Sequence, residues 1–474
     1  MGHVEGQSRY QSALMAPSLD EQVGAEHPVR VIDAFVDTLD LWALGFSRVV
    51  ADDMGRPPYH PRDLMKLYLY GYANGVRSSR RLEREAARNI EVLWLINRLS
   101  PSFKTIADFR KDHPEVIVDV CRAFVGFCRG QSLYGRELVA IDGTKVEAVA
   151  SNKKVVTPKT LEKQMAAIDR KIAEHLAAMD EADRREADQD ERLDVAAALE
   201  ALRGEHKLVA ARVKDLADRG LNQEVTGEED AKLMRTARHG HQVAYNAQTA
   251  VDAKHGLIAA FDLTSDGNDQ GLLLPMALKA KAALQTETLS VVADAGYSSG
   301  EQGEACETAG VTAIVPRPAT VNPRGDEYFT RDAFAYDEAA DAYSCPAGES
   351  LTRRDVERAD GKARYATAAC YGCALKPGCT TAARRIITRD INEDARQAMH
   401  ERALSDPAWM RQRRCLVEHP FATMKWLMGY PRFLVRGLRK AKAELALMVL
   451  SFNLKRAINI LGVPALMTRL QAAA

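Results

Sequence analysis

Two aspartates interrupt apolar segments whose alternation is typical of buried strands. Asp142 lies within Glu137-Leu-Val-Ala-Ile-Asp-Gly-Thr-Lys-Val-Glu-Ala-Val-Ala, and Asp294 follows Leu289-Ser-Val-Val-Ala. A carboxylate inside such a run costs several kcal/mol unless it is paired or bound to a metal. Gly296 breaks the second strand and leaves Asp294 at its C-terminal end, where open α/β sheets build their sites. A functional role explains these aspartates better than a structural one.

A third carboxylate, Glu418, lies on a predicted helix among positive charges. At about 100° per residue, Arg411, Arg414 and Lys425 fall within roughly 60° of its direction, and Val417, Phe421, Met424 and Met428 form an adjoining apolar stripe. Pro420 removes one helical N–H and allows a kink just after Glu418. An ordinary solvated helix with i,i+4 ion pairs is the alternative. The aspartates on strands favour instead a helix that gives a carboxylate to a metal while its cations hold phosphates.

Asp142, Asp294 and Glu418 together would form a hard, oxygen-rich site suited to Mg²⁺ or Mn²⁺. Two such ions about 4 Å apart hold both oxygens of an in-line phosphoryl displacement. Arg414 and Lys425 would then neutralise a nucleic-acid backbone beside the scissile bond. The three carboxylates therefore predict metal-dependent phosphoryl transfer on DNA.

Four of the eight cysteines lie close together in a polar, loop-rich segment. They are Cys345, followed by Pro-Ala-Gly, and Cys370-Tyr-Gly-Cys373-Ala-Leu-Lys-Pro-Gly-Cys379. This pattern matches a closed tetrahedral zinc site with four thiolate ligands, although the outer spacings are looser than in a double Cys-x2-Cys. A redox pair or buried thiols are the alternatives. The other four, Cys121, Cys128, Cys306 and Cys415, need no role beyond packing.

The 474 residues are enough for two or three domains, and 46% apolar with 27% charged residues is ordinary for a soluble globular protein. No apolar run reaches the length of a membrane span, and no signal pattern opens the chain, so we expect a cytoplasmic protein. The overall charge is balanced, but residues 411–460 hold eleven Lys and Arg against two acids, and residues 162–205 hold thirteen acids against seven bases. This distribution predicts a polyanion-binding segment beside a solvated acidic arm.

The elements around these residues divide into four regions. Residues 32–130 have helical periodicity throughout, with Pro61 at a first-turn position. The segment Thr105–Lys111 has the size of a helix that follows the turn in a helix-turn-helix unit. Basic residues able to reach phosphates in this region are Arg77, Arg80, Arg81, Lys104, Arg110 and Lys111. A plain helical bundle with a solvated basic face explains them equally well.

Residues 158–220 predict a helical hairpin, because apolar residues recur at alternating spacings of four and three along both arms. Strand patterns at 137–150, 241–252, 257–263, 289–294 and 311–315, with intervening helices, predict an α/β core of five strands, three of them antiparallel. The hairpin is thus an insertion between the first two strands.

Three motifs resemble the DDE transposases of bacterial insertion sequences: Asp142-Gly-Thr-Lys145, Ala293-Asp-Ala-Gly-Tyr297, and Arg414-x3-Glu418-x6-Lys425. The tail, with Glu418-His-Pro-Phe, Arg432-Phe, Arg436-Gly and Asn453-Leu-Lys-Arg, is similar to the insertion-sequence eleven-eighty-two family in particular. The cysteine-bearing insertion and the helical N-terminal region fit the same family. In one position the chain departs from it, because Arg411 stands where related transposases have a tyrosine, so no hairpin intermediate is carried over.

The resemblance implies a ribonuclease-H-like mixed five-stranded sheet with flanking helices and Asp142, Asp294 and Glu418 as the catalytic, metal-binding triad for two Mg²⁺ or Mn²⁺ ions. It also implies recognition of terminal inverted repeats and target DNA by a homodimer or larger assembly. Basic residues expected at the DNA are Arg411, Arg414, Lys425, Arg432, Arg436, Arg77, Arg80, Arg81, Lys104 and Lys145.

We therefore predict a transposase with a helical N-terminal DNA-binding domain over 1–130 and a catalytic core formed by 131–157, 221–316 and 391–474. The hairpin insertion spans 158–220, and the cysteine-rich insertion with a structural Zn²⁺ spans 317–390. A non-catalytic DNA-binding protein that retains the fold is the alternative, and a general Mg²⁺ nuclease is a weaker one.

Overall fold

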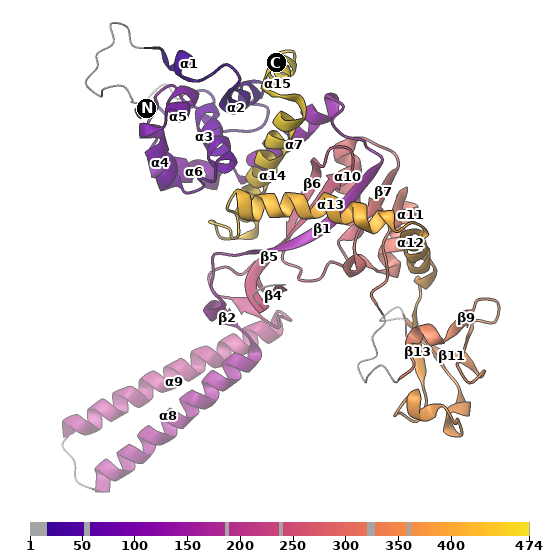
Figure 1. The fold of residues 1–474 in the computed structure, drawn as a ribbon. Coiled ribbons are helices and arrows are strands. Elements are labelled where there is room, and N and C mark those ends of the chain that lie inside the picture. The colour runs from indigo at the N-terminus through magenta and orange to yellow at the C-terminus, as the bar shows by residue number, and fades with distance from the viewer. Residues whose placement is uncertain are drawn as a thin grey trace, which may run out of the picture.

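The computed structural model describes residues 17–51, 57–184, 189–236, 240–319, 328–357 and 362–473. Its centre is a mixed sheet with helices on both faces, from which a helical hairpin and a small β module project (Figure 1). The predicted lead-in before Ile32 and the acidic stretch 180–194 lie partly outside the described residues.

The described part of the N-terminal region contains seven helices. They are α1 (Leu19–Gln22), α2 (Pro28–Asp37), α3 (Pro61–Ala73), α4 (Ser79–Arg88), α5 (Ile90–Leu95), α6 (Phe103–Asp112) and α7 (Pro114–Gly130). Helix α3 begins at Pro61, where a missing N–H costs nothing, and the His60 side chain accepts a hydrogen bond from Arg62 N. Nearly all of α3 is buried, so it forms the centre of this region.

The central sheet contains β1 (Leu138–Glu147), β4 (Lys232–Thr236), β5 (Gly240–Asp252), β6 (Ile258–Thr264), β7 (Leu289–Val292) and β8 (Val311–Ile314). Strand β1 pairs antiparallel with β5 and parallel with β7, and β7 pairs parallel with β8. The other edge of β5 pairs with β4 over its first residues and with β6 over its later ones. The order β6-β5-β1-β7-β8 is consistent with a ribonuclease-H-like transposase core.

The sheet therefore has six strands where the sequence predicted five. The additional strand, β4, is only five residues long and lies on the same edge as β6. Its short polar sequence, Lys-Leu-Met-Arg-Thr, has too little alternation to stand out from a loop.

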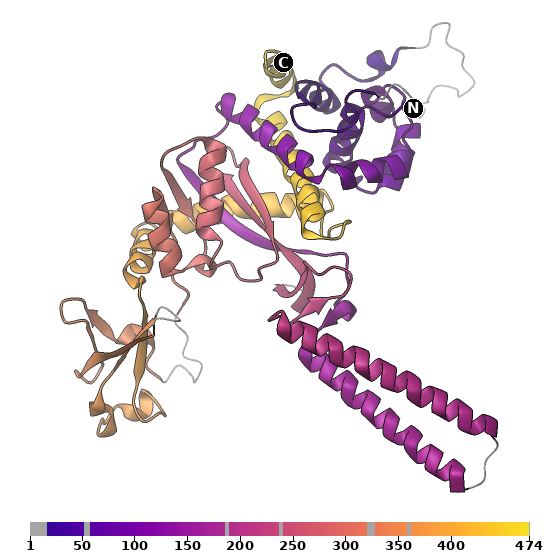
Figure 2. The same ribbon diagram turned by 180° about the vertical axis from the view of Figure 1, so that it is seen from behind.

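Helices cover the two faces of the sheet. Helix α13 (Ala408–Ala422) crosses one face, and α10 (Leu273–Leu284) lies on the opposite face, as the front and back views show (Figures 1 and 2). Helices α11 (Gly300–Thr308) and α12 (Glu393–Ser405) pack against each other beside β8. The short 3-10 helix η2 (Ala295–Tyr297) follows β7.

Pro420 does not end α13, which continues to Ala422. The expected disturbance comes one turn later, where η6 (Thr423–Leu427) is a π-helix closed by a bond from Met428 N to Thr423 O of 2.9 Å. Such π-turns inside α-helices are frequent at functional sites.

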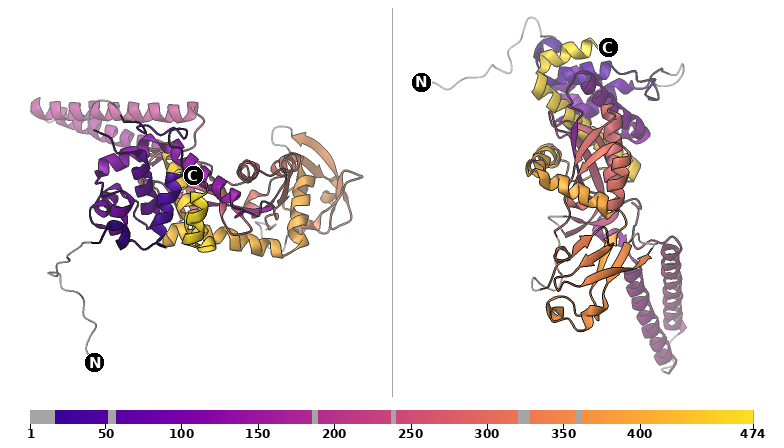
Figure 3. Two further views of the ribbon diagram at one scale, coloured as in Figure 1. Left: turned by 90° about the horizontal axis from the view of Figure 1, so that it is seen from above. Right: turned by 90° about the vertical axis from the view of Figure 1, so that its right-hand side faces the viewer.

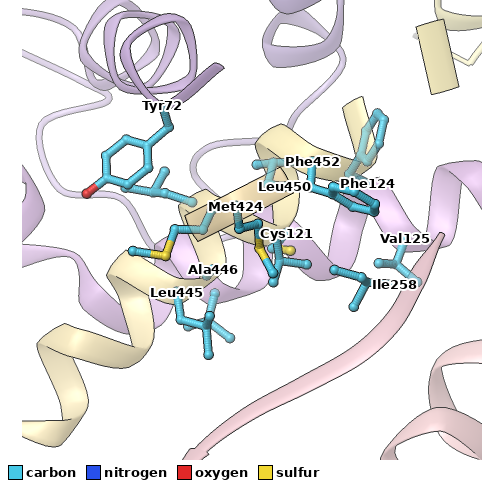
Figure 4. Packing of buried hydrophobic residues seen from close by; sticks show 14 of the residues in the cluster. Tyr72, Cys121, Phe124, Val125, Ile258, Met424, Leu445, Ala446, Leu450 and Phe452 are labelled. Atoms are coloured by element: carbon cyan, nitrogen blue, oxygen red, sulfur yellow. The ribbon is translucent and has the colours of Figure 1, made fainter. Parts of the chain in front are cut away.

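Helix α14 (Leu438–Leu461) joins the N-terminal helices to the sheet, and α15 (Val463–Gln471) follows it. Tyr72 of α3, Phe124 of α7, Ile258 of β6 and Leu450 of α14 share one apolar core (Figure 4). The Asn453 side chain both donates to Ile258 O and accepts from Ile258 N, at 2.8 and 2.9 Å, which fixes α14 to β6.

Among the described residues, no single helix is long and apolar enough to cross a membrane. Only α14 and α15 taken together meet that length and composition, and they are bent by 109° at the break between them.

Two smaller parts project from the core. The hairpin consists of α8 (Pro158–Arg184) and α9 (Gln189–Asp218), whose seam is formed by Leu161, Ile168, Val209 and Leu216. At its base lie η1 (Asn152–Lys154) and the paired strands β2 (Val155–Val156) and β3 (Glu224–Val225). It extends away from the sheet in every view (Figures 1 to 3).

The β module is a five-stranded antiparallel sheet in the order β13-β12-β11-β10-β9. Its elements are η3 (Arg331–Ala333), β9 (Ala335–Asp337), β10 (Ala342–Ser344), β11 (Ser350–Glu357), β12 (Lys362–Ala366), η4 (Ala368–Tyr371), η5 (Lys376–Gly378) and β13 (Ile386–Asp390). Phe334, Tyr343, Leu351, Tyr365 and Ile387 form its own small core. The module is therefore packed around apolar residues that are separate from the central core.

Candidate active site

Strand alternation places Asp142 and Asp294 on the same face of the sheet. Ala140 of β1 and Val292 of β7 are buried against Val417 of α13. Each aspartate follows one of these residues by two positions, and the backbone at Asp294 is still extended. Since alternate residues of a strand share a face, both carboxylates lie on the face that α13 covers.

Arg413 of α13 joins the two aspartates. Its Nη2 atom lies 2.8 Å from Oδ1 of Asp142 and 3.0 Å from Oδ2 of Asp294. The side chains of Arg413, Asp142 and Asp294 are 15%, 20% and 46% exposed. The carboxylates from two separate strands are thus brought to one nitrogen atom at a partly open position.

Burial raises the pKa of Asp142 to about 6. The Arg413 guanidinium opposes this effect, and the nearby charge of Asp294 adds to it. The backbone N–H of Gly143 donates to Asp142 Oδ1 at 2.8 Å, and the backbone N–H of Gly296 donates to Asp294 Oδ1 at 2.8 Å. These two bonds orient the carboxylates from the backbone next to each aspartate, within β1 for Asp142 and after the end of β7 for Asp294.

Glu418 lies on the neighbouring, exposed flank of α13, together with Arg411 and Arg414. It makes no side-chain hydrogen bond or ion pair within the described part of the chain. In that part, no three His, Cys, Asp or Glu side chains are grouped closely enough to hold a metal ion. The structure therefore brings Asp142 and Asp294 together and leaves Glu418 apart from them on the helix that covers them.

The ammonium groups of Lys425 and Lys145 both contact other groups of the protein. Lys425 Nζ donates to Thr144 Oγ1 at 2.5 Å and to Lys145 O at 2.8 Å, which ties η6 to β1. Lys145 Nζ lies 3.4 Å from Asp269 on the other face of the sheet. Arg432 and Arg436 are exposed on the segment that follows η6, and this segment pairs with the end of β1 through Phe433 N and Glu147 O at 2.8 Å.

A polar network on the other face of the sheet joins β1 to the turn that holds Asp294. Asp269 accepts hydrogen bonds from Asn246 Nδ2 at 2.7 Å and from Gln248 Nε2 at 2.8 Å. Gln248 Oε1 accepts a hydrogen bond from the hydroxyl of Tyr297. Because Tyr297 ends η2, directly after Asp294, the network supports both aspartates from beneath.

The N-terminal basic residues divide into an inward and an outward group. Arg77 donates to Arg432 O at 2.8 Å and lies 3.4 Å from the fully buried Glu444. Arg110 is buried and donates to Tyr72 Oη at 3.1 Å. Arg80, Arg81, Lys104 and Lys111 are exposed. The inward pair joins the helical region to the core, and the outward residues remain accessible to a ligand.

All eight cysteines are free thiols. Cys345, Cys370, Cys373 and Cys379 line one cavity of the β module, with Phe334, Leu351 and Arg385 among its other walls. Burial raises the pKa of the Cys379 thiol, and the other three cysteines add to this effect. The predicted four cysteines thus face a common space, although their side chains do not lie close enough together to hold an ion.

Sequence reasoning missed two groups of residues at this site. Arg413 was overlooked in favour of Arg411 and Arg414, although Arg413 is four residues before the apolar Val417 and hence on the inward side of the helix. Asp269, Asn246 and Gln248 gave no signal, because polar residues in a strand and its turn are ordinary.

Two family models match the chain. Residues 17–112 match Transposase domain (DUF772), and residues 344–458 match Transposase DDE domain. The second range contains Glu418 and the four cysteines of the β module, whereas Asp142 and Asp294 lie outside both ranges.

A solved structure, described as a piggyBac transposase synaptic complex with hairpin DNA, aligns over 95% of this chain and 80% of that chain. Its TM-score is 0.35 and its sequence identity is 8%, a likeness too slight to carry an argument. No curated protein matches the chain. The two family matches lie toward opposite ends of the chain, and both are to transposase domains.

Proposed function

We propose that this protein is the transposase of a bacterial insertion sequence of the eleven-eighty-two type. It binds the terminal inverted repeats of its element and catalyses metal-dependent strand cleavage and strand transfer. The observation that carries the proposal is the pairing of Asp142 and Asp294, from two strands, at one point beneath the helix that bears Glu418.

The donor set fits a hard divalent ion. Asp142 and Asp294 offer carboxylate oxygens at one cationic position, now filled by the Arg413 guanidinium, and Glu418, on the helix that covers them, is unpaired among the described residues. When bound, Mg²⁺ supplies charge that activates the attacking oxygen and stabilises the leaving one. Asp142, Asp294 and Glu418 would be the residues that hold it.

The chain's own cations hold the DNA. Arg411 and Arg414 are exposed on the flank of α13 that carries Glu418, and Arg432 and Arg436 are exposed on the segment that follows. Arg80, Arg81 and Lys104 are exposed on the N-terminal helices, which Arg77 joins to the segment that carries Arg432. Phosphate contacts by such residues position the duplex without reading its sequence.

Cleavage of a labelled duplex that carries the element's inverted repeat tests the proposal. Wild type with Mg²⁺ nicks the repeat boundary, Glu418→Gln binds the duplex without nicking it, and EDTA abolishes the nick. Glu401→Gln, an exposed glutamate on α12, is the matched control and retains wild-type cleavage. Nicking that survives Glu418→Gln would show that the third carboxylate is a different residue.

A non-catalytic DNA-binding protein is the second candidate. It is favoured by one observation, the occupation of both aspartates by Arg413. If wild type binds the inverted repeat but does not cleave it in Mg²⁺ or Mn²⁺, the result would favour the non-catalytic DNA-binding protein. Equal cutting of unrelated duplexes would instead indicate a general nuclease.

We also propose that Cys345, Cys370, Cys373 and Cys379 bind a structural Zn²⁺. The cavity that they share supports this, and metal binding that completes the local fold would bring the four thiols to bonding distance. Metal content of purified protein tests it: about one zinc per wild-type chain, loss in Cys373→Ser, and no change in Cys415→Ser, an exposed cysteine outside the cavity. Equal zinc in both variants would contradict the proposal.

A further inference from the structure

Arg413 has an arrangement that an ordinary surface ion pair lacks. One nitrogen atom, Nη2, contacts carboxylates from two different strands, at 2.8 and 3.0 Å. A single positive centre shared by two carboxylates is also the arrangement of a bridging metal ion, whose oxygen ligands lie at about 2.0–2.1 Å for Mg²⁺. The two carboxylates that Nη2 now contacts are those that would hold such an ion.

Within the part of the chain that the structure describes, these two carboxylates hold the guanidinium at the site. Its Nε atom is buried and has no hydrogen-bond partner in the described part of the chain. A buried donor without a partner costs free energy, which offsets part of the gain from the two ion pairs. Asp294 is nearly half exposed, which leaves an open side through which the guanidinium can move out.

The position of Arg413 on α13 makes this contact specific. Its neighbours Arg411 and Arg414 are exposed, whereas Arg413 faces the sheet one turn before the buried Val417. Without a cation between them, Asp142 and Asp294 would repel each other under the helix. Arg413 relieves this repulsion in the metal-free protein.

We infer that Arg413 is an internal counter-cation that holds Asp142 and Asp294 together in the metal-free protein and must leave their oxygens before a divalent ion binds. The inference rests on the proposed function, because it takes these aspartates as metal ligands. Arg413 is a positioning residue in this account, and it competes with the metal for the same oxygens.

Mn²⁺ binding, followed by electron paramagnetic resonance on full-length protein without DNA, tests the inference. In Arg413→Met the dissociation constant for Mn²⁺ falls by about tenfold or more, on the scale of one hydrogen bond to a charged group. Arg170→Met, at an exposed arginine of the hairpin helix α8, leaves it unchanged. Arg413→Lys retains a positive charge on a shorter side chain, so its dissociation constant for Mn²⁺ is intermediate. This variant provides the test if Arg413→Met folds poorly.

Thermal unfolding provides a second readout. In EDTA, Arg413→Met unfolds at a lower temperature than wild type, and saturating Mn²⁺ raises its unfolding temperature more than that of wild type.

Weaker or unchanged Mn²⁺ binding in both Arg413 variants would overturn the inference. If Mn²⁺ binding in wild type is lost in Asp142→Asn but unaffected by Arg413→Met, only this inference fails. If Asp142→Asn binds Mn²⁺ as wild type does and no repeat is cut, the proposed function fails as well.

Discussion

Gly143 and Gln248 face each other across the pair formed by β1 and β5, and a β-carbon on Gly143 would lie 2.1 Å from Nε2 of Gln248. A side chain at position 143 would therefore fit only if Gln248 moved. Gln248 cannot move freely, because it donates to Asp269 and accepts from Tyr297. The glycine next to Asp142 is therefore required by the polar network beneath the site, not by a turn.

We expect Gly143→Ala to destabilise the protein by about 1–3 kcal/mol, the usual cost of forcing extra atoms into a packed region. The added methyl group displaces Gln248 and breaks its bonds to Asp269 and Tyr297. Urea unfolding followed by circular dichroism measures the loss.

The variant Gly143→Ala/Gln248→Ala separates this clash from other effects of the alanine. Because Gln248→Ala removes the clashing group, the double variant is more stable than the sum of the two single changes predicts. Simple additivity would mean that the clash is not with Gln248.

The sequence was sufficient for some of these features and not for others. The aspartates were found because a charge in an apolar strand is conspicuous, and the mixed sheet followed from strand periodicity. The choice between Arg413 and Arg414 depends on which side of α13 meets the sheet, and the spacing of Arg413 to the buried Val417 was the signal that was overlooked. The family matches support the transposase prediction in two parts of the chain, residues 17–112 and 344–458, whereas the insertion-sequence type stays a prediction.

The role of Arg77 also could not be predicted from the sequence. Its partners Arg432 and Glu444 are more than 350 residues away along the chain, and a basic residue before a helix is ordinarily solvated. Such long-range pairs are invisible to local patterns. The four cysteines, by contrast, were recognisable from spacing alone, and they do line one cavity.

Tyr297→Phe tests whether the network supports the turn that holds Asp294. The change keeps the buried ring and removes the hydroxyl that donates to Gln248, so we expect a loss of about 1–2 kcal/mol in unfolding free energy. We also expect weaker Mn²⁺ binding, because Asp294 is held less firmly. Tyr371→Phe, an exposed tyrosine of the β module, is the control. A stability loss with unchanged Mn²⁺ affinity would limit the network to a structural role.

Arg77 and Arg80 lie close together in the sequence, but we expect their alanine substitutions to have different effects on stability and DNA binding. Arg77→Ala leaves Glu444 buried without its ion-pair partner, and we expect a loss of about 3 kcal/mol in unfolding free energy. Arg80→Ala removes an exposed cation, so stability changes little, while DNA affinity falls and its dependence on salt becomes weaker. Unfolding curves and fluorescence anisotropy at several salt concentrations measure the two effects. Reduced DNA affinity in stably folded Arg77→Ala would instead assign Arg77 to the DNA interface.

The raised pKa of Asp142 predicts how metal-free stability depends on pH. Its pKa is about 6 in the folded protein, against an ordinary value of 3.8, because burial disfavours the charged form. Between these values the folded state binds more protons than the unfolded state, so this contribution to stability is complete below about pH 4 and is lost as the pH rises to about 6. The total change is at most roughly 3 kcal/mol.

In EDTA, the unfolding free energy of wild type relative to Asp142→Asn should fall over this interval and remain constant above it. Asp218→Asn, at the exposed end of α9, should show no such trend. A difference between wild type and Asp142→Asn that rises with pH would mean that the Arg413 ion pair outweighs burial at Asp142.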